Sequence, residues 1–409
     1  MRILHLCDSL NPAGLGGYES HLHYLSKEMA KYSHESYIVT QSPNRNSPES
    51  IDHDNYKIIH LPGNYLEARK WVFFSAPEES RENLVDQLFE PNDMESNVDE
   101  LKKQLLATID VIKPDIIHAH STYVVFNRVL HTLVEDGKIK QIPLVATIHG
   151  LSKPLILPSG EKTTDYNQLV QFCPFDLFLA VSDTVAVTLR EHLSPIGLEH
   201  IVKRHYIGIN LDAFRPDSKM KKKWDIAFLG RLEPMKSVDV FPEMLEILKK
   251  THPDLKMVMT GEGSLRQSVL EEFSRRDVAY MVDYLGVVET SEVANIINSA
   301  KIFLYPSRME PFGLSVIEAM ACSVPVVTSN VYGPSEIITH EKDGLTVTPG
   351  DAVALASAIK RLLSDSELYD QIRNNARSTV QERFDIQVQT KKLVDIYTTL
   401  LAEKKVQEE

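Results

Sequence analysis

Cysteine is scarce in this chain, which has only three in 409 residues, Cys7, Cys173 and Cys322. They lie far apart and form no C-x-x-C pair, which argues against a disulfide scaffold and against a structural zinc site. Long apolar runs are also missing. Since the sequence has no stretch of about 18 consecutive apolar residues, it predicts no transmembrane helix. Residues 1–8 have the pattern of a buried strand and become polar too soon for a signal peptide. We therefore expect a cytoplasmic protein.

Positive charge is in deficit, since 44 Lys and Arg against 57 Asp and Glu give a formal net charge of −13. This balance argues against nucleic acid as a partner, because binding to a phosphate backbone needs clustered Lys and Arg. The one basic cluster is residues 219–223. We interpret it as a solvated connector between domains; peripheral contact with the anionic lipid of a membrane face is the alternative.

The length and a hydrophobic content of 43% predict a folded protein of two or three domains. Short apolar runs alternate with helical patterns, and this alternation predicts α/β domains with parallel, doubly wound sheets. In the first half the predicted strands are residues 2–7, 36–40, 56–60, 115–120, 144–150 and 177–182. In the second half the predicted strands are residues 224–229, 255–260, 301–305, 324–328 and 344–347. We predict two Rossmann-like domains, residues 1–215 and 224–385.

The least regular part of the sequence is residues 64–97, which contain an aromatic cluster and a run of acidic residues. We interpret it as an insertion or lid of the N-terminal domain, where the acceptor is recognised. An ordinary surface elaboration is the alternative.

The most informative segment runs from Glu310 to Glu318, between an apolar strand and an apolar-periodic helix. A strand, a short loop with a glycine, and a helix N-terminus together present backbone N–H groups and a positive dipole end to an anion. Two carboxylates bracket this site, and a carboxylate suits hydroxyl groups rather than phosphate. The segment therefore predicts a ligand with both a diphosphate and polyols, namely a nucleotide-sugar.

This segment, E-P-F-G-L-S-V-I-E-A-M-A, resembles the E-x7-E motif of the retaining GT-B glycosyltransferases of family four. Residues 16–19 resemble the family's G-G-x-E loop, and residues 230–236 its G-R-x-x-x-x-K segment. Residues 261–263 resemble its G-x-G loop, and residues 333–338 its late G-P-x-E-I-I segment. The resemblance implies a GT-B fold, with two Rossmann-like domains facing each other across a cleft. It also implies that the last helix, about residues 386–405, packs back on the N-terminal domain.

The resemblance implies a hexosyltransferase that moves a sugar from a nucleoside-diphosphate donor to an acceptor hydroxyl with retention. A UDP-sugar is the favoured donor, and no metal or further cofactor is expected. The acceptor is left open between a saccharide, a lipid-linked compound and a small metabolite. Two rival interpretations are a nucleotide-sugar epimerase and an inactive sugar-nucleotide-binding protein on the same fold.

Four residues are expected to take part in the reaction. Arg231 and Lys236 follow a strand and would stabilise the departing nucleoside diphosphate. Glu310 would hydrogen-bond hydroxyls of the transferred sugar. His149 ends a strand, where imidazole can hydrogen-bond the sugar or the transferring group; a purely structural role is the alternative.

The residues expected to bind the donor share loop or helix N-terminal positions, and Glu318 would take the ribose hydroxyls. They are Gly16, Gly17, Gly230, Phe312, Gly313, Leu314, Ser315 and Glu318. The chain departs from the family pattern at Ser237 and Tyr332, where glycine is more usual.

His118 and His120 are two residues apart on one predicted strand, and therefore on one face. A metal site would need a third ligand, which the sequence does not indicate. For His120 the alternatives are contact with the acceptor and packing.

Overall fold

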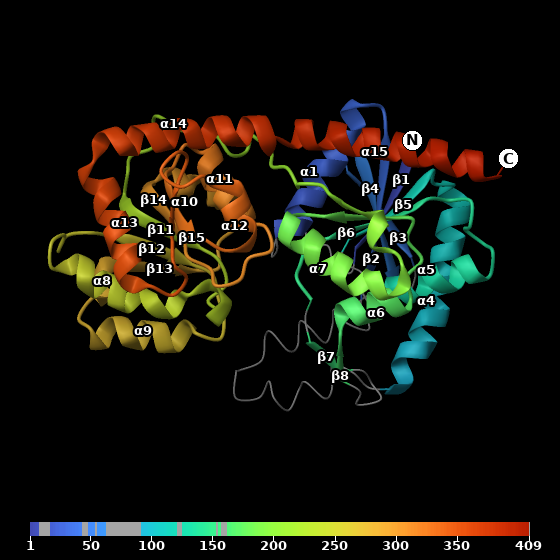
Figure 1. The fold of residues 1–409 in the computed structure, drawn as a ribbon, viewed down its shortest axis with the longest axis horizontal. Coiled ribbons are helices and arrows are strands. Elements are labelled where there is room, and N and C mark those ends of the chain that lie inside the picture. Colours follow the sequence, from blue (N-terminus) through green and yellow to red (C-terminus); the bar gives the residue numbers. More distant parts are fainter. Residues whose placement is uncertain are drawn as a thin grey trace. The chain divides into compact units, whose positions relative to one another are not determined.

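The computed structural model describes residues 1–7, 17–42, 48–53, 55–62, 91–120, 125–152, 154–156 and 162–408 (Figure 1). The chain divides into two compact units. The first consists of Met1–Pro12, Tyr18–Tyr206 and Thr390–Glu409, and the second of Ala13–Gly17 and Ile207–Gln389. The division falls after Tyr206 rather than near residue 215, since Ile209 forms a parallel bridge with Asp385 of the second unit.

The first unit contains an eight-stranded sheet in the order β10-β9-β6-β5-β1-β2-β4-β3. All its pairs are parallel except β3 with β4. The strands are β1 (Arg2–Cys7), β2 (Glu35–Ser42), β3 (Glu49–His53), β4 (Tyr56–Pro62), β5 (Ile116–His120), β6 (Leu144–Ile148), β9 (Leu177–Ala180) and β10 (Val202–Arg204). The helices are α1 (Gly17–Lys31), α4 (Pro91–Ile112), α5 (Val125–Glu135), α6 (Asp165–Gln171) and α7 (Asp183–Leu193), and a small hairpin pairs β7 (Pro154–Ile156) with β8 (Lys162–Thr164).

The second unit contains a six-stranded parallel sheet in the order β13-β12-β11-β14-β15-β16. Its strands are β11 (Trp224–Leu229), β12 (Met257–Thr260), β13 (Val282–Gly286), β14 (Ala300–Tyr305), β15 (Val326–Ser329) and β16 (Leu345–Val347). Its helices are α8 (Phe241–Lys249), α9 (Arg266–Arg275), α10 (Thr290–Asn298), α11 (Leu314–Ala321), α12 (Tyr332–Ile337), α13 (Ala352–Ser364) and α14 (Ser366–Arg383). Strands β12 and β15 are buried throughout, as expected of a parallel sheet covered on both faces.

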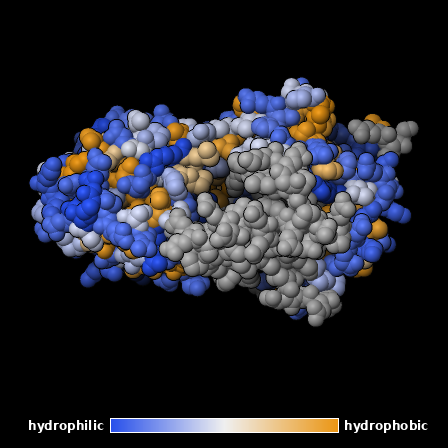
Figure 2. All heavy atoms as spheres, turned by 90° about the horizontal axis from the view of Figure 1, so that it is seen from below, coloured by the Kyte–Doolittle hydropathy of each residue, from blue (hydrophilic) through white to orange (hydrophobic). Residues whose placement is uncertain are grey.

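The final helix, α15 (Ile386–Glu408), contributes its residues from Thr390 onward to the first unit. There the hydroxyl of Tyr397 bonds to Nδ1 of His118, and Nζ of Lys404 lies 2.8 Å from a carboxylate oxygen of Asp176. Within the described residues, no helix is both long and apolar enough to cross a membrane. On the face in Figure 2, hydrophilic residues predominate over the second unit, with apolar residues scattered between them.

Each sheet has a topological switch point, where the chain order reverses on either side of its first strand. In the first unit this strand is β1, which lies between β5 and β2. In the second unit it is β11, which lies between β12 and β14. Ligands of open α/β sheets bind in the crevice outside the carboxyl ends of the strands at such a point. Residues that follow β11 and β14, or β1 and β5, are therefore the first candidates for a site.

Two glycines allow the loops of the second unit to approach each other closely. Gly261 has a φ of 111°, and a Cβ there would lie 2.0 Å from the carbonyl oxygen of Gly230. A Cβ on Gly333 would lie 2.3 Å from Cα of Phe312. Both glycines belong to segments that resemble family motifs. At each, the lack of a side chain allows the backbone to pack against a neighbouring loop of the predicted donor site.

Ser237 and Tyr332 adopt left-handed backbone conformations, with φ values of 55° and 45°. These are the positions where the family more usually has glycine, and glycine adopts positive φ at no steric cost. Ser237 is also fully buried, and its hydroxyl has no hydrogen-bond partner among the described residues.

We expect Ser237→Gly to stabilise the protein by about 0.5–1 kcal/mol. Relief of a left-handed serine is worth about 1–2 kcal/mol, of which the greater freedom of glycine in the unfolded chain removes about 0.5–1 kcal/mol. The measurement is chemical denaturation of the two proteins. Ser307→Gly is the matched control, because Ser307 is also buried with an unpartnered hydroxyl but is not among the positive-φ residues. The Ser307→Gly variant should be less stable than the wild type. If both glycine variants were more stable, positive φ at Ser237 would not be the cause.

Histidine is concentrated in the first unit, where several imidazoles are buried in the core. Burial, together with neighbouring histidines, lowers the pKa of His5 and His149 to about 3, and the pKa of His205 similarly. The same causes hold the pKa of His118 and His120 well below the usual value. The second unit has only His252 and His340. The first unit therefore folds around neutral imidazoles.

We expect the first unit to be the more sensitive to acid. Its unfolded chain takes up a proton on each of these histidines near pH 6.5. In the folded unit the pKa of His5, His149 and His205 is about 3, and the pKa of His118 and His120 is well below 6.5. The free energy of unfolding should therefore fall as the pH drops from 6.5 towards 4, by about 1.4 kcal/mol per pH unit for each such histidine. Hydrogen exchange at pH 7 and pH 5, corrected for the intrinsic pH dependence, should show β1, β5 and β6 losing protection before β11 and β14. Loss of protection in the second unit first would contradict the expectation.

Candidate active site

A buried ion pair joins the two loops at the switch point of the second unit. Lys236 lies in a single 3₁₀ turn after β11, and Glu310 lies in the loop after β14. The Nζ of Lys236 is 2.5 Å from Oε2 of Glu310, and the two residues are only 7% and 8% exposed. Because an unpaired buried charge is strongly unfavourable, each residue needs the other in place.

Tyr305 completes this pair into a cluster of three. Its hydroxyl accepts a hydrogen bond from Nζ of Lys236 at 2.7 Å and donates one to Oε2 of Glu310 at 2.9 Å. Burial and the neighbouring Glu310 carboxylate raise the pKa of Tyr305 to about 12, so the phenol keeps its proton. Burial alone would lower the pKa of Lys236, but the Tyr305 and Glu310 oxygens hold it above its usual range. Tyr305 was not predicted, although a phenol at the carboxyl end of an apolar strand was a signal for it.

A second ion pair fastens the same two loops together near the surface. The guanidinium of Arg308 donates to both carboxylate oxygens of Asp239, at 2.6 and 2.8 Å, and to the carbonyl of Pro234. The backbone N–H of Arg308 also donates to the carbonyl of Met235. These bonds tie the Lys236 loop to the Glu310 loop from outside and fix the geometry of the cluster.

Helix α11 begins directly after the Glu310 loop. Its cap residue, Gly313, has a φ of 111°, a left-handed conformation that suits glycine. The first amides of a helix have no acceptor within the helix, so Leu314 and Ser315 lie where an anion can be bound. Phe312 is buried and packs edge-to-face on Phe384, and its N–H lies 3.4 Å from Oε1 of Glu310.

Glu318 lies one turn further along α11 and is half-buried. Burial raises the pKa of its carboxyl group to about 7. Arg231, by contrast, is exposed, and its guanidinium lies 3.7 Å from the sulfur of Met235. The structure thus brings Lys236 and Glu310 together, whereas among the described residues Arg231 and Glu318 form no hydrogen bond or ion pair with that cluster. Gly230 lies at the end of β11, and its N–H points to the carbonyl of Thr260.

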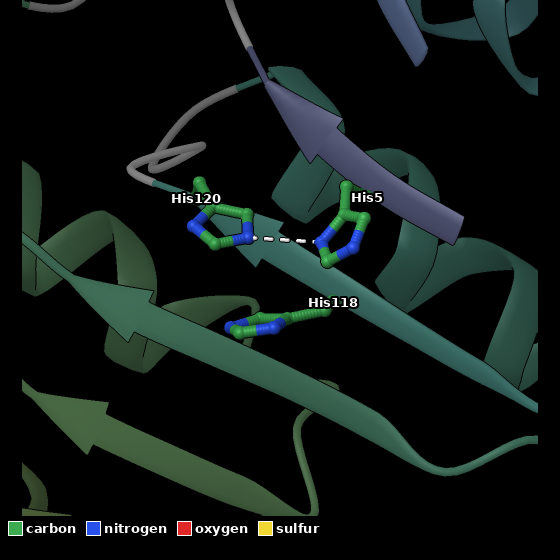
Figure 3. A group of neighbouring side chains, drawn as sticks. All are labelled: His5, His118 and His120. Atoms are coloured by element: carbon green, nitrogen blue, oxygen red, sulfur yellow. Dashed lines mark hydrogen bonds between the residues drawn. The ribbon is translucent and has the colours of Figure 1, made fainter. Parts of the chain in front are cut away.

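In the first unit, three neighbouring strands bring a group of histidines together. His5 of β1 is the register partner of His118 on β5, and His120 follows on the same strand (Figure 3). Nδ1 of His5 lies 3.2 Å from Nε2 of His120, and Nδ1 of His120 lies 3.3 Å from Nε2 of His149, which follows β6. His5 was not predicted, because only the register of β1 against β5 places it beside His118. Gly17 opens α1, and Gly16 lies outside the described residues, as does most of the proposed lid at residues 64–97.

His5, His118 and His120 each offer a nitrogen within 4.8 Å of the others, so the third imidazole that a metal site would need is present. The ring of His118 is held by Tyr397 at Nδ1 and by the Thr147 hydroxyl, 2.7 Å away, at Nε2. His120 is only 1% exposed and bonds to a histidine at each ring nitrogen. This arrangement favours packing over the predicted contact with an acceptor.

Two family models match consecutive parts of the chain. Residues 15–201 match the model described as Glycosyltransferase Family 4, and residues 211–379 match the one described as Glycosyl transferases group 1. The first match falls mostly in the first unit and the second in the second unit, and neither includes α15.

Similar proteins extend over nearly the whole chain. A glycogen synthase of Mycobacterium tuberculosis is 24% identical over 97% of this chain and 94% of its own. Sucrose-phosphate synthase from Thermosynechococcus elongatus has the same fold, with a TM-score of 0.78, 21% identity, and coverage of 98% and 99%. HepE from Anabaena, solved in complex with UDP-glucose, has a TM-score of 0.67 and 18% identity, over 98% of this chain and all of its own.

The predicted fold class is confirmed: each unit has a doubly wound sheet, parallel except for the β3–β4 pair, and the similar solved structures are glycosyltransferases of the GT-B fold. With both family models matched in order along the chain, this protein belongs to the family-four, group 1 glycosyltransferases.

Proposed function

We propose that this glycosyltransferase is a retaining enzyme that transfers a sugar from a UDP-sugar to an acceptor hydroxyl without a metal ion. The observation that carries the proposal is the buried cluster of Lys236, Tyr305 and Glu310 at the switch point between β11 and β14. It places a cation and a carboxylate side by side, where a ligand with both phosphates and hydroxyls would need them.

The diphosphate would be bound by positive charge and backbone amides. An ammonium group has three N–H donors, of which Glu310 and Tyr305 take two, so Lys236 has a third for a phosphate oxygen. Arg231 is exposed and able to turn its guanidinium fork towards a second oxygen. The amides of Gly313, Leu314 and Ser315 add the positive end of α11. These groups would stabilise the negative charge that develops on the leaving group, a task that a metal performs elsewhere.

The hydroxyl groups of the donor would be read by the two glutamates. A carboxylate has about four acceptor sites. Lys236 and Tyr305 occupy Oε2 of Glu310, which leaves Oε1, 3.4 Å from the backbone nitrogen of Phe312, for hydroxyls of the transferred sugar. Glu318 would bind the ribose. Because its pKa is about 7, it can accept a hydrogen bond from one hydroxyl and, when protonated, donate one to another. The complex of HepE with UDP-glucose supports uracil as the base.

Retention would follow from displacement on one face of the sugar. The bond from the anomeric carbon to the phosphate oxygen breaks, the bond to the acceptor oxygen forms on the same face, and the acceptor proton passes to the departing phosphate oxygen. The alternative of a covalent intermediate needs two carboxyl groups about 5 Å apart on opposite faces of the sugar. Glu310 and Glu318 come from one loop and the helix that follows it, which supports the same-face route. In the first unit, His149 would hydrogen-bond the transferred sugar.

Slow hydrolysis of the donor tests this proposal without knowledge of the acceptor, because water replaces the acceptor hydroxyl. Time-resolved proton NMR with UDP-glucose and excess EDTA should show α-glucose released first, followed by mutarotation. Release of β-glucose would contradict retention, and activity only after metal is restored would contradict metal independence.

We expect Glu310→Gln to lower the rate of donor hydrolysis roughly 100-fold or more, the usual cost of removing one group that stabilises the transition state. Glutamine keeps an oxygen for Lys236 but not the charge, so a clear fall in the thermal midpoint is also expected, and rates are compared per folded molecule. The dissociation constant for UDP should stay within about threefold, since the phosphate contacts remain. Glu341→Gln, at an exposed glutamate of the same unit, is the control. Unchanged hydrolysis by the Glu310 variant would contradict its role.

A further inference from the structure

The hydroxyl of Tyr305 bonds to both charges of the buried ion pair. It is 2.7 Å from Nζ of Lys236 and 2.9 Å from Oε2 of Glu310. An ammonium group only donates hydrogen bonds and an ionised carboxylate only accepts them. The phenol therefore accepts from Lys236 and donates to Glu310, and the reverse arrangement is impossible. Since burial and the neighbouring carboxylate raise the pKa of Tyr305 to about 12, its proton stays in place at neutral pH.

Two donors consequently meet at one oxygen of Glu310. Lys236 bonds to Oε2 at 2.5 Å, and Tyr305 bonds to the same atom. With a single donor the carboxylate could pivot about that bond, whereas two donors at different positions fix the plane of the group. The other oxygen, Oε1, lies 3.4 Å from the backbone nitrogen of Phe312, beyond the usual length of such a hydrogen bond. The position of Oε1 is thus determined mainly by the bonds at Oε2.

The ring that carries this hydroxyl is held by packing. Tyr305 is 5% exposed, and its ring stacks on those of Phe228 and Phe303, with centroids 6.3 and 6.1 Å away. A Cβ on Gly230 would lie 3.6 Å from Cε2 of Tyr305, so the end of β11 packs against the ring. A side chain locked in this way can hold a neighbouring group in one geometry.

We propose that Tyr305 is a positioning residue, which fixes the plane of the Glu310 carboxylate so that Oε1 has one orientation towards the hydroxyls of the transferred sugar. This role rests on the proposed function, in which Glu310 binds that sugar. The proton of the phenol is committed to Glu310 and the side chain is buried. Tyr305 therefore acts through Glu310 rather than on the sugar itself.

A role through Lys236, the other partner of the phenol, predicts a different effect. It would show in the affinity for the phosphates, which Lys236 is proposed to contact. Without the phenol, however, Lys236 keeps its own bond to Glu310 and has one more N–H to offer rather than one fewer. Loss of the hydroxyl should therefore preserve the binding of UDP and lower the rate of the reaction.

The first test is carbon-13 NMR of the full-length protein labelled at its glutamate carboxyl carbons, with the Glu310 signal assigned from the Glu310→Gln variant. Tyr305→Phe keeps the stacked ring and removes only the hydroxyl. In this variant the Glu310 signal should shift and broaden, because the carboxylate loses a donor and samples more than one orientation.

Tyr369→Phe is the matched control. The hydroxyl of Tyr369 donates to the carbonyl of Lys301, 2.9 Å away, at the amino end of β14, whereas Tyr305 is at the carboxyl end of the same strand. This variant loses a hydrogen bond of the same length in the same unit and should also be less stable. It should change neither the Glu310 signal nor the rate of hydrolysis per folded molecule.

The second test is hydrolysis of radiolabelled UDP-glucose, with rates compared per folded molecule. Tyr305→Phe should lower kcat about 10-fold, since small misplacements of a group in an active site have effects of this size or larger. The dissociation constant for UDP should stay within about threefold, because Lys236 keeps its donors. In a Glu310→Gln background, Tyr305→Phe should lower kcat by less than about twofold, because an effect that passes through Glu310 is already lost there.

Three results would overturn the inference: an unchanged Glu310 signal in Tyr305→Phe, an equal fall in kcat with and without the Glu310 carboxylate, or a loss of UDP affinity as large as the fall in kcat. The last result would assign the effect of Tyr305 to Lys236.

The proposed function fails separately. If the wild-type protein hydrolyses no UDP-glucose, the donor assignment falls and the NMR comparison decides alone. A Glu310 signal that changes in Tyr305→Phe but not in Tyr369→Phe then supports the positioning role, and an equal response of the two variants contradicts it. If hydrolysis occurs and Tyr305→Phe leaves both the signal and kcat unchanged, only the inference falls.

Discussion

The ion pair of Lys236 and Glu310 is the interaction on which the second unit depends. The two residues lie 74 positions apart and meet only because β11 and β14 are neighbours in the sheet. Burial makes each charge unfavourable alone, and Tyr305 and the Arg308–Asp239 pair hold the surrounding loops so that neither is left alone. Most of the electrostatic cost of assembling such a site is therefore met when the protein folds, before any ligand binds. This preorganisation is what stabilisation of a developing charge requires.

The first unit has no comparable ion pair among the described residues at its switch point. Its switch point is lined by neutral imidazoles, which bond to one another and to Tyr397 of α15. Neutral rings avoid the cost of a buried charge, yet their single proton gives each chain of bonds a direction. We therefore expect a unit whose buried histidines are neutral at neutral pH and which becomes less stable in acid. The second unit thus has an ion pair at the switch point of its sheet, and the first unit has neutral hydrogen-bonding rings there.

The two sheets and the loop around Glu310 could be predicted from the sequence, whereas contacts that depend on strand order could not. Alternating apolar strands and helices predicted both parallel sheets, and the motif around Glu310 predicted a loop and helix for an anion. Strand order and register are not contained in any local sequence pattern. They determine the contact of Lys236 with Glu310, the hydrogen bonds of Tyr305 to both, and the position of His5 beside His118. At Ser237 and Tyr332 the sequence showed a departure from glycine, but only the backbone revealed that both residues adopt positive φ.

The most direct test of the central claim is thermal unfolding with UDP, GDP, ADP, CDP and dTDP, each with excess EDTA. A ligand that binds only the folded state raises its stability by mass action. We expect a clear rise with UDP that survives EDTA and is lost in Lys236→Met. No rise with any diphosphate, in a protein shown to be folded, would contradict a preorganised donor site at the Lys236–Glu310 pair.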